Sequence, residues 1–192
     1  MGTSEIFHAT FDEHMKVAHE TAKKLEHDFT SLVAACSETV GGGGKLIFFG
    51  NGGSAAAAQQ IAALLSVRAV KDRPAIAALA LTTDTSVLTA AASGLGYEHV
   101  FERQVEALGR RGDLAIGIST SGKSPNVALA LTAARKQGLV TAALTGAEPN
   151  AIKDLADHPI CVPSKTAARV HEMHIVIGHM LCAGIEKHLG YV

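Results

Sequence analysis

The most informative stretch of the chain is Ile118-Ser119-Thr120-Ser121-Gly122-Lys123-Ser124, where an apolar run stops at a cluster of small hydroxyl residues. The residues just before it, from Ala115 to Ile118, predict a buried strand, and those from Pro125 to Ala134 predict a helix. A strand that leads into a Ser/Thr/Gly turn at a helix N-terminus offers hydroxyls, backbone N–H groups and a helix dipole to an anion. The stretch therefore predicts an anion-binding turn.

A second strand, turn and helix of the same type follow Leu46, in the sequence Leu-Ile-Phe-Phe-Gly-Asn-Gly-Gly-Ser that ends at Ser54. Two such turns on one sheet favour a ligand with a phosphate and a polar body. A purely structural alternative, with Ser54 and Ser124 as helix N-caps, would explain either turn alone. The Gly-x-Gly-x-x-Ala pattern from Gly50 also permits a dinucleotide, but the next strand ends at Thr82-Thr83 without an acidic residue for a ribose.

From residue 45 onward, short apolar strands alternate with helical segments. This alternation predicts a parallel sheet with helices on both faces and a ligand site beyond the carboxyl ends of the strands. The expected strands are Lys45–Gly50, Ile76–Leu81, Leu114–Ile118, Val140–Leu144 and Ile160–Val162, and the expected helices are Ser54–Val67, Ser86–Ala92, Glu98–Leu108, Pro125–Lys136, Asn150–Ala156 and Ala168–Leu189.

The first forty residues stand outside this alternating pattern. From Ser4 to about Thr39, apolar residues recur every three or four positions, which predicts one long amphipathic helix or two. The segment ends at the breaker Gly41-Gly42-Gly43-Gly44. We expect residues 1–40 to pack on the sheet, on a partner subunit or on both, within a single domain of 192 residues whose core is 45–192.

Composition narrows the class of protein. An apolar content of 47% supports a real core, and a net charge of −1 gives no electrostatic footprint for direct nucleic-acid binding. No apolar run is long enough to span a membrane, and the first residues lack the pattern of a signal peptide. Cys36, Cys161 and Cys182 are expected to be buried free thiols of a cytoplasmic protein.

Three motifs together carry a resemblance to a known family. Gly50-Asn51-Gly52-Gly53-Ser54, Thr82-Thr83-Asp84-Thr85-Ser86 and Ser119-Thr120-Ser121-Gly122-Lys123-Ser124 resemble the sugar isomerase (SIS) domain, and more narrowly the bacterial phosphoheptose isomerases. The likeness runs from about Lys45 to His188. It implies a flavodoxin-like, five-stranded parallel sheet and a homotetramer whose N-terminal helices form a central bundle.

The resemblance also implies roles for particular residues. Family members interconvert sedoheptulose 7-phosphate and glycero-manno-heptose 7-phosphate, a precursor of lipopolysaccharide. The substrate-binding residues that it implies are Asn51, Gly52, Gly53, Ser54, Asp84, Ser119, Thr120, Ser121 and Ser124, of which Ser54 and the last four hold the phosphate and Asn51 and Gly52 line the sugar.

The catalytic positions depart from the family pattern. A His and, four residues later, a Glu that serves as base and zinc ligand correspond here to Gln60 and Leu64. The Asn-Asp of the family is Ser93-Gly94, its Asp at the start of the last helix is Ala168, and the Gln three residues later is His171. Only His179 on the last helix matches.

His171 and His179 are therefore the candidate acid and base, since isomerisation needs one group to remove a carbon-bound proton and another to serve the oxygens. Eight residues apart on a helix, they lie about 80° beyond two turns and roughly 12 Å apart along the axis. Zinc prefers three or four ligands, so a metal held by Gln60, His171 and His179 has a thin ligand set. His174 is expected on the surface of the helix or at an interface.

The sequence leaves several functions open. The first is an isomerase with an atypical active site, and the second is a phosphosugar-binding protein without catalysis. A third is a protein-interaction scaffold that resembles the replication-initiator-associating relative of the family. A dinucleotide-dependent oxidoreductase is the fourth. No membrane or direct nucleic-acid partner is expected.

Overall fold

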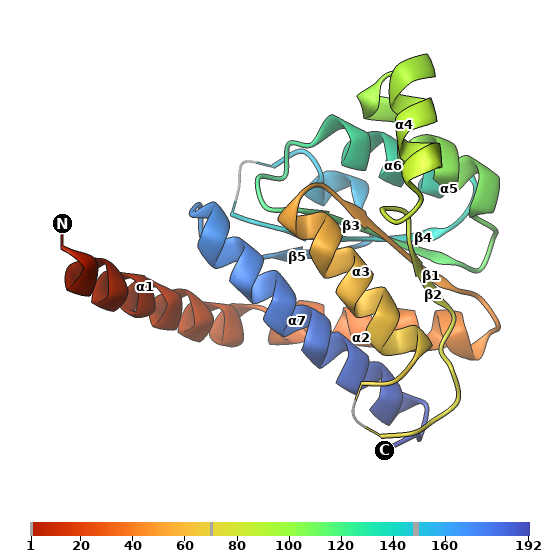
Figure 1. The fold of residues 1–192 in the computed structure, drawn as a ribbon. Helices are drawn as coiled ribbons and strands as arrows, with labels where there is room; N and C mark the ends of the chain where they lie inside the picture. Colours follow the sequence, from red (N-terminus) through yellow and green to blue (C-terminus); the bar gives the residue numbers. More distant parts are fainter. Residues whose placement is uncertain (1, 70, 148–149) are drawn as a thin grey trace.

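The computed structural model describes residues 2–69, 71–147 and 150–192, which form a parallel five-stranded sheet between two helical layers (Figure 1). The strands are β1 (Leu46–Gly50), β2 (Ala78–Ala80), β3 (Leu114–Ser119), β4 (Val140–Thr145) and β5 (His158–Cys161), in the order β2-β1-β3-β4-β5. The helices are α1 (Thr3–Lys24), α2 (Glu26–Gly41), α3 (Gly53–Ser66), α4 (Thr85–Gly94), α5 (Glu102–Leu108), α6 (Pro125–Lys136) and α7 (Ala167–His188), with 3₁₀ turns η1 (Tyr97–His99) and η2 (Lys153–Leu155). The α/β fold expected from the sequence is confirmed.

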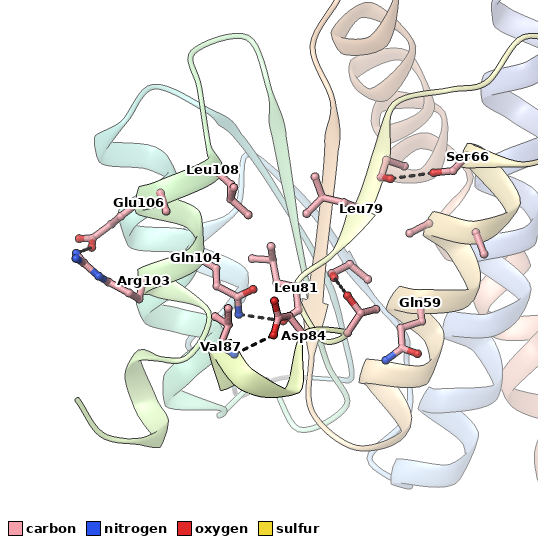
Figure 2. A pocket seen from close by; sticks show the side chains of 16 residues that line it. Gln59, Ser66, Leu79, Leu81, Asp84, Val87, Arg103, Gln104, Glu106 and Leu108 are labelled. Carbon is pink, nitrogen blue, oxygen red and sulfur yellow. Dashed lines mark hydrogen bonds and ion pairs between the residues drawn. The ribbon is translucent and has the colours of Figure 1, made fainter. Parts of the chain in front are cut away.

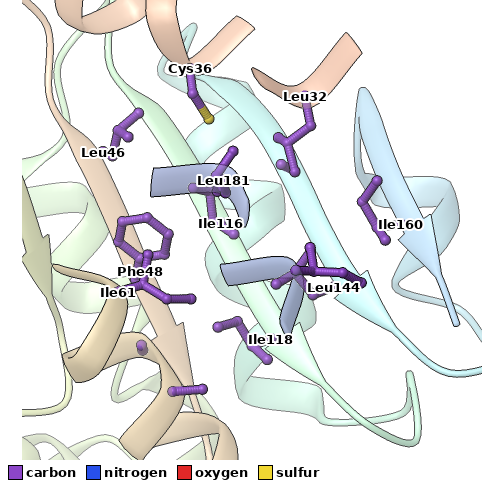
Figure 3. Packing of buried hydrophobic residues seen from close by; sticks show 14 of the residues in the cluster. Leu32, Cys36, Leu46, Phe48, Ile61, Ile116, Ile118, Leu144, Ile160 and Leu181 are labelled. Atoms are coloured by element: carbon purple, nitrogen blue, oxygen red, sulfur yellow. The ribbon is translucent and has the colours of Figure 1, made fainter. Parts of the chain in front are cut away.

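Two apolar layers hold the sheet, because alternate side chains of each strand point to opposite faces. On one face, α2, α3 and α7 cover Phe48, Ile116 and Leu144, as Figure 3 shows. On the other face, α4, α5 and α6 pack over a cluster that includes Phe49 and Ala143. The central strands β1, β3 and β4 are buried on both sides, which explains why they are almost continuous apolar runs.

The N-terminal segment forms two helices that break at Leu25, one of the two alternatives that the sequence allowed. Helix α2 lies against the sheet, whereas α1 projects from the body of the molecule (Figure 1). The contacts that hold α1 to the start of α7 are polar. His14 Nδ1 lies 2.7 Å from Glu172 Oε2, and Arg169 donates to the Thr10 carbonyl and pairs with Glu172.

Some expected elements differ from the structure. The helix expected at Asn150–Ala156 is only the 3₁₀ turn η2, because the backbone is already extended at Ala156 and enters β5 at His158. The helix expected at Glu98–Leu108 is interrupted, since Val100 and Phe101 turn into the core between η1 and α5. The strand expected at Ile76–Leu81 shortens to β2, and the last strand begins at His158.

Two burial predictions were wrong for single side chains. Cys36 and Cys182 are buried free thiols as expected, but Cys161 is only half-buried because it lies on the edge strand β5. His174 is fully buried rather than on the surface, since its face of α7 packs against the end of β4. No described helix is long and apolar enough to cross a membrane.

Candidate functional site

The two glycine-and-serine turns lie side by side. Strands β1 and β3 are neighbours in the sheet, and Gly50 pairs with Ile118 at their carboxyl ends. A Cβ atom at Gly50 would lie 2.6 Å from the Ile118 carbonyl oxygen, so strands β1 and β3 are in close contact where the turns begin. The two turns therefore begin next to each other at the same edge of the sheet.

In the second turn, the Ser124 hydroxyl does not cap helix α6, and several backbone amides are unpaired. Ser124 occupies the N-cap position of α6, but its Oγ lies 2.9 Å from Ser119 Oγ and makes no bond to a helix amide. Among the described residues, the backbone N–H groups of Thr120, Ser121 and Ser124 have no hydrogen-bond partner. Unpaired amides at a helix N-terminus are the donors that bind anions.

The first turn differs in its backbone bonds, since the Ser54 N–H donates to the Asn51 carbonyl at 2.9 Å. Gly52 adopts φ +55° in the N-cap position of α3, and the helix begins at Gly53. Ser54 therefore lies inside the helix, buried in its first turn, and is not the N-cap that the structural alternative required. Ser124 is the N-cap residue of α6 by position, as the structural alternative expected, but neither serine caps its helix through its side chain.

His171 belongs to this site by position. A Cβ atom at Gly53 would lie 3.1 Å from His171 Cε1 and Nε2, so the imidazole packs directly against the first turn. Its Nδ1 atom is buried and has no hydrogen-bond partner in the described part of the chain. Helix α7 thus brings one of the two predicted histidines to the glycine turn.

His179 lies further along α7 and faces α3. Its Nε2 atom is 3.0 Å from Gln60 Nε2, a contact between the amide and the imidazole across the two exposed helix faces. Leu64, one turn beyond Gln60, packs against the apolar cluster and offers no ligand atom. The described residues contain no group of three or more His, Cys, Asp or Glu side chains placed to hold a metal. Gln60 and His179 together offer two of the three or four ligands that zinc takes.

The hydrogen bond of the Asp84 side chain is made within helix α4 and not to either glycine-and-serine turn. Its carboxylate accepts the Val87 N–H at 3.0 Å and caps α4. It also lines a pocket of about 900 Å³ at the β2 edge of the sheet, between α3 and α5 (Figure 2). Gln104, which is buried there, donates to the Leu81 carbonyl at 3.0 Å.

Two contact residues were missed by the sequence reasoning. Asn126 is 2% exposed, and its amide makes two reciprocal hydrogen bonds with the Asn51 amide, at 2.8 and 2.9 Å. The Tyr97 hydroxyl also donates to Asn51 Oδ1, at 3.0 Å. A polar residue directly after Pro125 at a helix start was a usable signal for Asn126. Nothing local in the sequence pointed to Tyr97.

Beneath the second turn, His174 is held neutral. Its Nε2 lies 3.2 Å from the Thr145 carbonyl oxygen and donates to it, and its Nδ1 is buried without a partner among the described residues. The pKa of His174 is lowered to about 4, chiefly by burial and to a smaller extent by the neighbouring His171, while the bond to Thr145 opposes the change.

This depressed pKa predicts acid sensitivity. Between pH 6.5, the ordinary pKa of histidine, and about pH 4, the unfolded chain binds a proton at His174 that the folded chain does not. We expect this residue to remove about 3 kcal/mol of stability as the pH falls through that range. Urea unfolding of the wild type and of His174→Gln at pH 7 and 4.5 measures it. Equal losses of stability in the two proteins would contradict the assignment.

Comparison with known proteins agrees with the fold and the turns. A model of the SIS domain matches residues 11–146, and the chain belongs to the SIS domain family. It is 53% identical over 174 residues to the phosphoheptose isomerase of Paramagnetospirillum magneticum, with 91% of each chain covered. It is 46% identical over 175 residues to that of Nitratiruptor sp., covering 91% of this chain and 94% of the relative.

Solved structures give the same result. Phosphoheptose isomerase GmhA of Neisseria gonorrhoeae superposes with a TM-score of 0.91 at 38% identity, over 97% of this chain and all of that one. A phosphoheptose isomerase of Francisella tularensis superposes with a TM-score of 0.94 at 31% identity, with the same coverage. Within the SIS domain family, the chain is a member of the phosphoheptose isomerase group. The resemblance seen in the sequence is confirmed, and the dinucleotide alternative loses its basis.

Proposed function

We propose that this protein is an aldose–ketose isomerase that acts on a seven-carbon sugar phosphate, converting sedoheptulose 7-phosphate to the heptose 7-phosphate. The observation that carries the proposal is the adjacency of the two turns at one edge of the sheet, together with the backbone N–H groups of Thr120, Ser121 and Ser124, which have no partner among the described residues. Full-length similarity to phosphoheptose isomerases supports the choice of substrate class.

In this proposal the phosphate lies between the two turns. Ser119, Ser121 and Ser124 offer hydroxyls, and the free amides of the second turn offer N–H donors. The helix dipoles of α3 and α6 add favourable field at their N-termini. Charge-assisted hydrogen bonds of this kind contribute about 1.5 to 3 kcal/mol each. The remaining residues assigned to the substrate are Asn51, Gly52, Gly53, Ser54, Asp84 and Thr120.

The proton transfers are assigned to the two histidines. His171 lies against the first turn, and His179 contacts Gln60, so both belong to the side of the sheet covered by α3 and α7. Histidine suits the work because its ordinary pKa allows it to exchange protons near neutral pH. No step is assigned to a metal. Leu64, an apolar residue at the position of the family base, makes this active site atypical.

An assay with sedoheptulose 7-phosphate, with and without added zinc, tests the activity. Calorimetry with the same ligand tests binding separately, on the wild type, Ser121→Ala and the exposed control Ser4→Ala. We expect turnover, and binding at least about threefold weaker in Ser121→Ala only. Binding without turnover would overturn the isomerase and leave the non-catalytic phosphosugar-binding protein. The absence of binding would overturn both, and recovery of a replication initiator in a pull-down would then favour the scaffold.

The quaternary state belongs to the same proposal: residues 1–40 assemble the core, 45–192, into a homotetramer. Helix α1 exposes Ile6, Phe7, Phe11 and Met15, each more than half exposed. An apolar groove of about 290 Å³ continues this surface between α1, α2 and α7, lined in part by Met173 and Ile177. Burial of such side chains contributes about 1.5 to 3 kcal/mol each.

Disruption of this apolar surface should therefore lower the molecular mass in solution. We expect Phe11→Ser to shift the protein toward smaller species at micromolar concentration in size-exclusion chromatography with light scattering. Leu95→Ser is the matched control, since Leu95 is 53% exposed and Phe11 52%. An unchanged mass in Phe11→Ser, or an equal change in both variants, would argue against assembly through α1.

A cytoplasmic location completes the proposal. Its support is that the three cysteines are free thiols and that two of them are buried, as in proteins of a reducing compartment.

A further inference from the structure

Asn51 in the first turn is fixed by two neighbours from different elements. Asn126 at the start of α6 pairs with it through two reciprocal amide hydrogen bonds. Tyr97, in the turn η1 after α4, donates its hydroxyl proton to Asn51 Oδ1 at 3.0 Å. Asn126 is almost completely buried, whereas the Tyr97 side chain is 59% exposed. The contact with Asn126 fixes Asn51 to the protein interior, whereas the contact with Tyr97 joins it to a solvent-exposed side chain.

These contacts restrict what Asn51 can offer to a ligand. An amide oxygen accepts about two hydrogen bonds, and Asn51 Oδ1 already accepts from Asn126 and Tyr97. The amide nitrogen has two N–H groups, of which one is used by Asn126 Oδ1. Asn51 therefore keeps one donor and no acceptor.

The missing acceptor is supplied by Tyr97. Its proton is engaged by Asn51, and no other bond of its oxygen is found among the described residues, so the oxygen keeps lone pairs toward solvent. The free N–H of Asn51 and the free lone pairs of the Tyr97 oxygen thus belong to two groups that are hydrogen-bonded to each other. A sugar hydroxyl, which both donates and accepts, matches this arrangement, whereas the dianionic phosphate group of a sugar phosphate has no proton to donate.

We propose that Tyr97 is a specificity-determining residue that accepts a hydrogen bond from a hydroxyl of the sugar body, next to the Asn51 amide. The inference rests on the proposed phosphosugar binding and adds the residue that distinguishes a sugar phosphate from free phosphate. Tyr97 acts on the substrate itself, in contrast to Asn126, which positions Asn51.

The role of Tyr97 can be tested directly, because the second tyrosine of the chain provides a matched control. Tyr97 and Tyr191 are the only tyrosines, and there is no tryptophan. Calorimetry compares the wild type, Tyr97→Phe and the control Tyr191→Phe, each with inorganic phosphate and with sedoheptulose 7-phosphate. We expect Tyr97→Phe to bind the sugar phosphate about five- to tenfold more weakly and inorganic phosphate within twofold of wild type. Tyr191→Phe should bind both as the wild type does.

Fluorescence gives a second readout, because Tyr97 is the sole tyrosine of Tyr191→Phe. Its emission should change on addition of the sugar phosphate and stay constant with inorganic phosphate. Equal weakening of both ligands in Tyr97→Phe, or unchanged sugar phosphate binding, would overturn this inference alone. A wild type that binds neither ligand would overturn the proposed function together with it.

Discussion

Gly122→Ala should disable the second turn. Gly122 has φ +63°, and an added Cβ atom would lie 2.1 Å from Asn150 Cβ and 2.6 Å from its Cγ. A left-handed conformation costs a residue other than glycine about 1 to 2 kcal/mol, and the overlap forces the turn or the Asn150 segment to move. We expect stability to fall by about 3 kcal/mol or more and sugar phosphate binding to weaken at least tenfold. Urea unfolding and calorimetry measure the two effects.

Two further variants separate backbone strain from the steric overlap. Gly190 has a similar φ of +72°, and an added Cβ atom there meets nothing within 4 Å. Gly190→Ala should therefore cost only about 1 to 2 kcal/mol and leave binding intact. Asn150→Gly in the Gly122→Ala background removes the clashing atoms and should restore part of the stability. If Gly122→Ala behaves like Gly190→Ala, the close packing of the turn has no functional consequence.

Arg73→Ala should be the most destabilising change outside the site. Arg73 and Glu186 form an ion pair at 2.7 Å, with side chains only 1% and 4% exposed. The guanidinium also donates to the carbonyls of Leu64 and Leu65 at the end of α3, each at 2.7 Å. Removal of one partner leaves the other charge buried and alone, which costs about 3 to 5 kcal/mol. Thermal or urea unfolding of the variant measures the loss.

An exposed ion pair on the same loop provides the control. Arg68 and Asp72 lie 2.6 Å apart, but their side chains are 59% and 88% exposed. Because exposed pairs contribute about 0 to 1 kcal/mol, Arg68→Ala should be nearly neutral. Replacement of both Arg73 and Glu186 by leucine should recover part of the loss, since it removes the stranded charge. A loss below 1 kcal/mol in Arg73→Ala would refute the assigned role.

Most of the architecture could be predicted from local patterns. The apolar runs that became β1, β3 and β4 and the periodic segments that became α3, α6 and α7 were expected within a residue or two of their observed bounds. Such runs carry their information locally, because a strand buried on both faces must be apolar throughout. The less regular segments were harder. The residues after Asn150 form only one 3₁₀ turn before the chain enters β5, and Val100 and Phe101 leave a helical path to fill the core.

Within the candidate site, the sequence revealed the types of residue present but not the contacts between them. The hydroxyl-rich turns and the two candidate histidines His171 and His179 were evident in the sequence, and the position of His171 against Gly53 agrees with that expectation. The contacts of Asn51 with Asn126 and Tyr97 were not evident, since they join residues 46 and 75 positions apart. The full burial of His174 was likewise invisible, because its helix carries polar and apolar residues on neighbouring faces.

The sequence by itself determined the alternation of strands and helices, the two glycine-and-serine turns and the departures at Gln60 and Leu64. These are properties of neighbouring residues, and chain geometry transmits them directly to local structure. The tertiary structure decided which strands are adjacent, and so whether the two turns meet. It also decided that Gln60 contacts His179 and that Tyr97 reaches Asn51. Such pairings depend on the packing of whole elements, in which many small burial terms act together and no single residue carries the information.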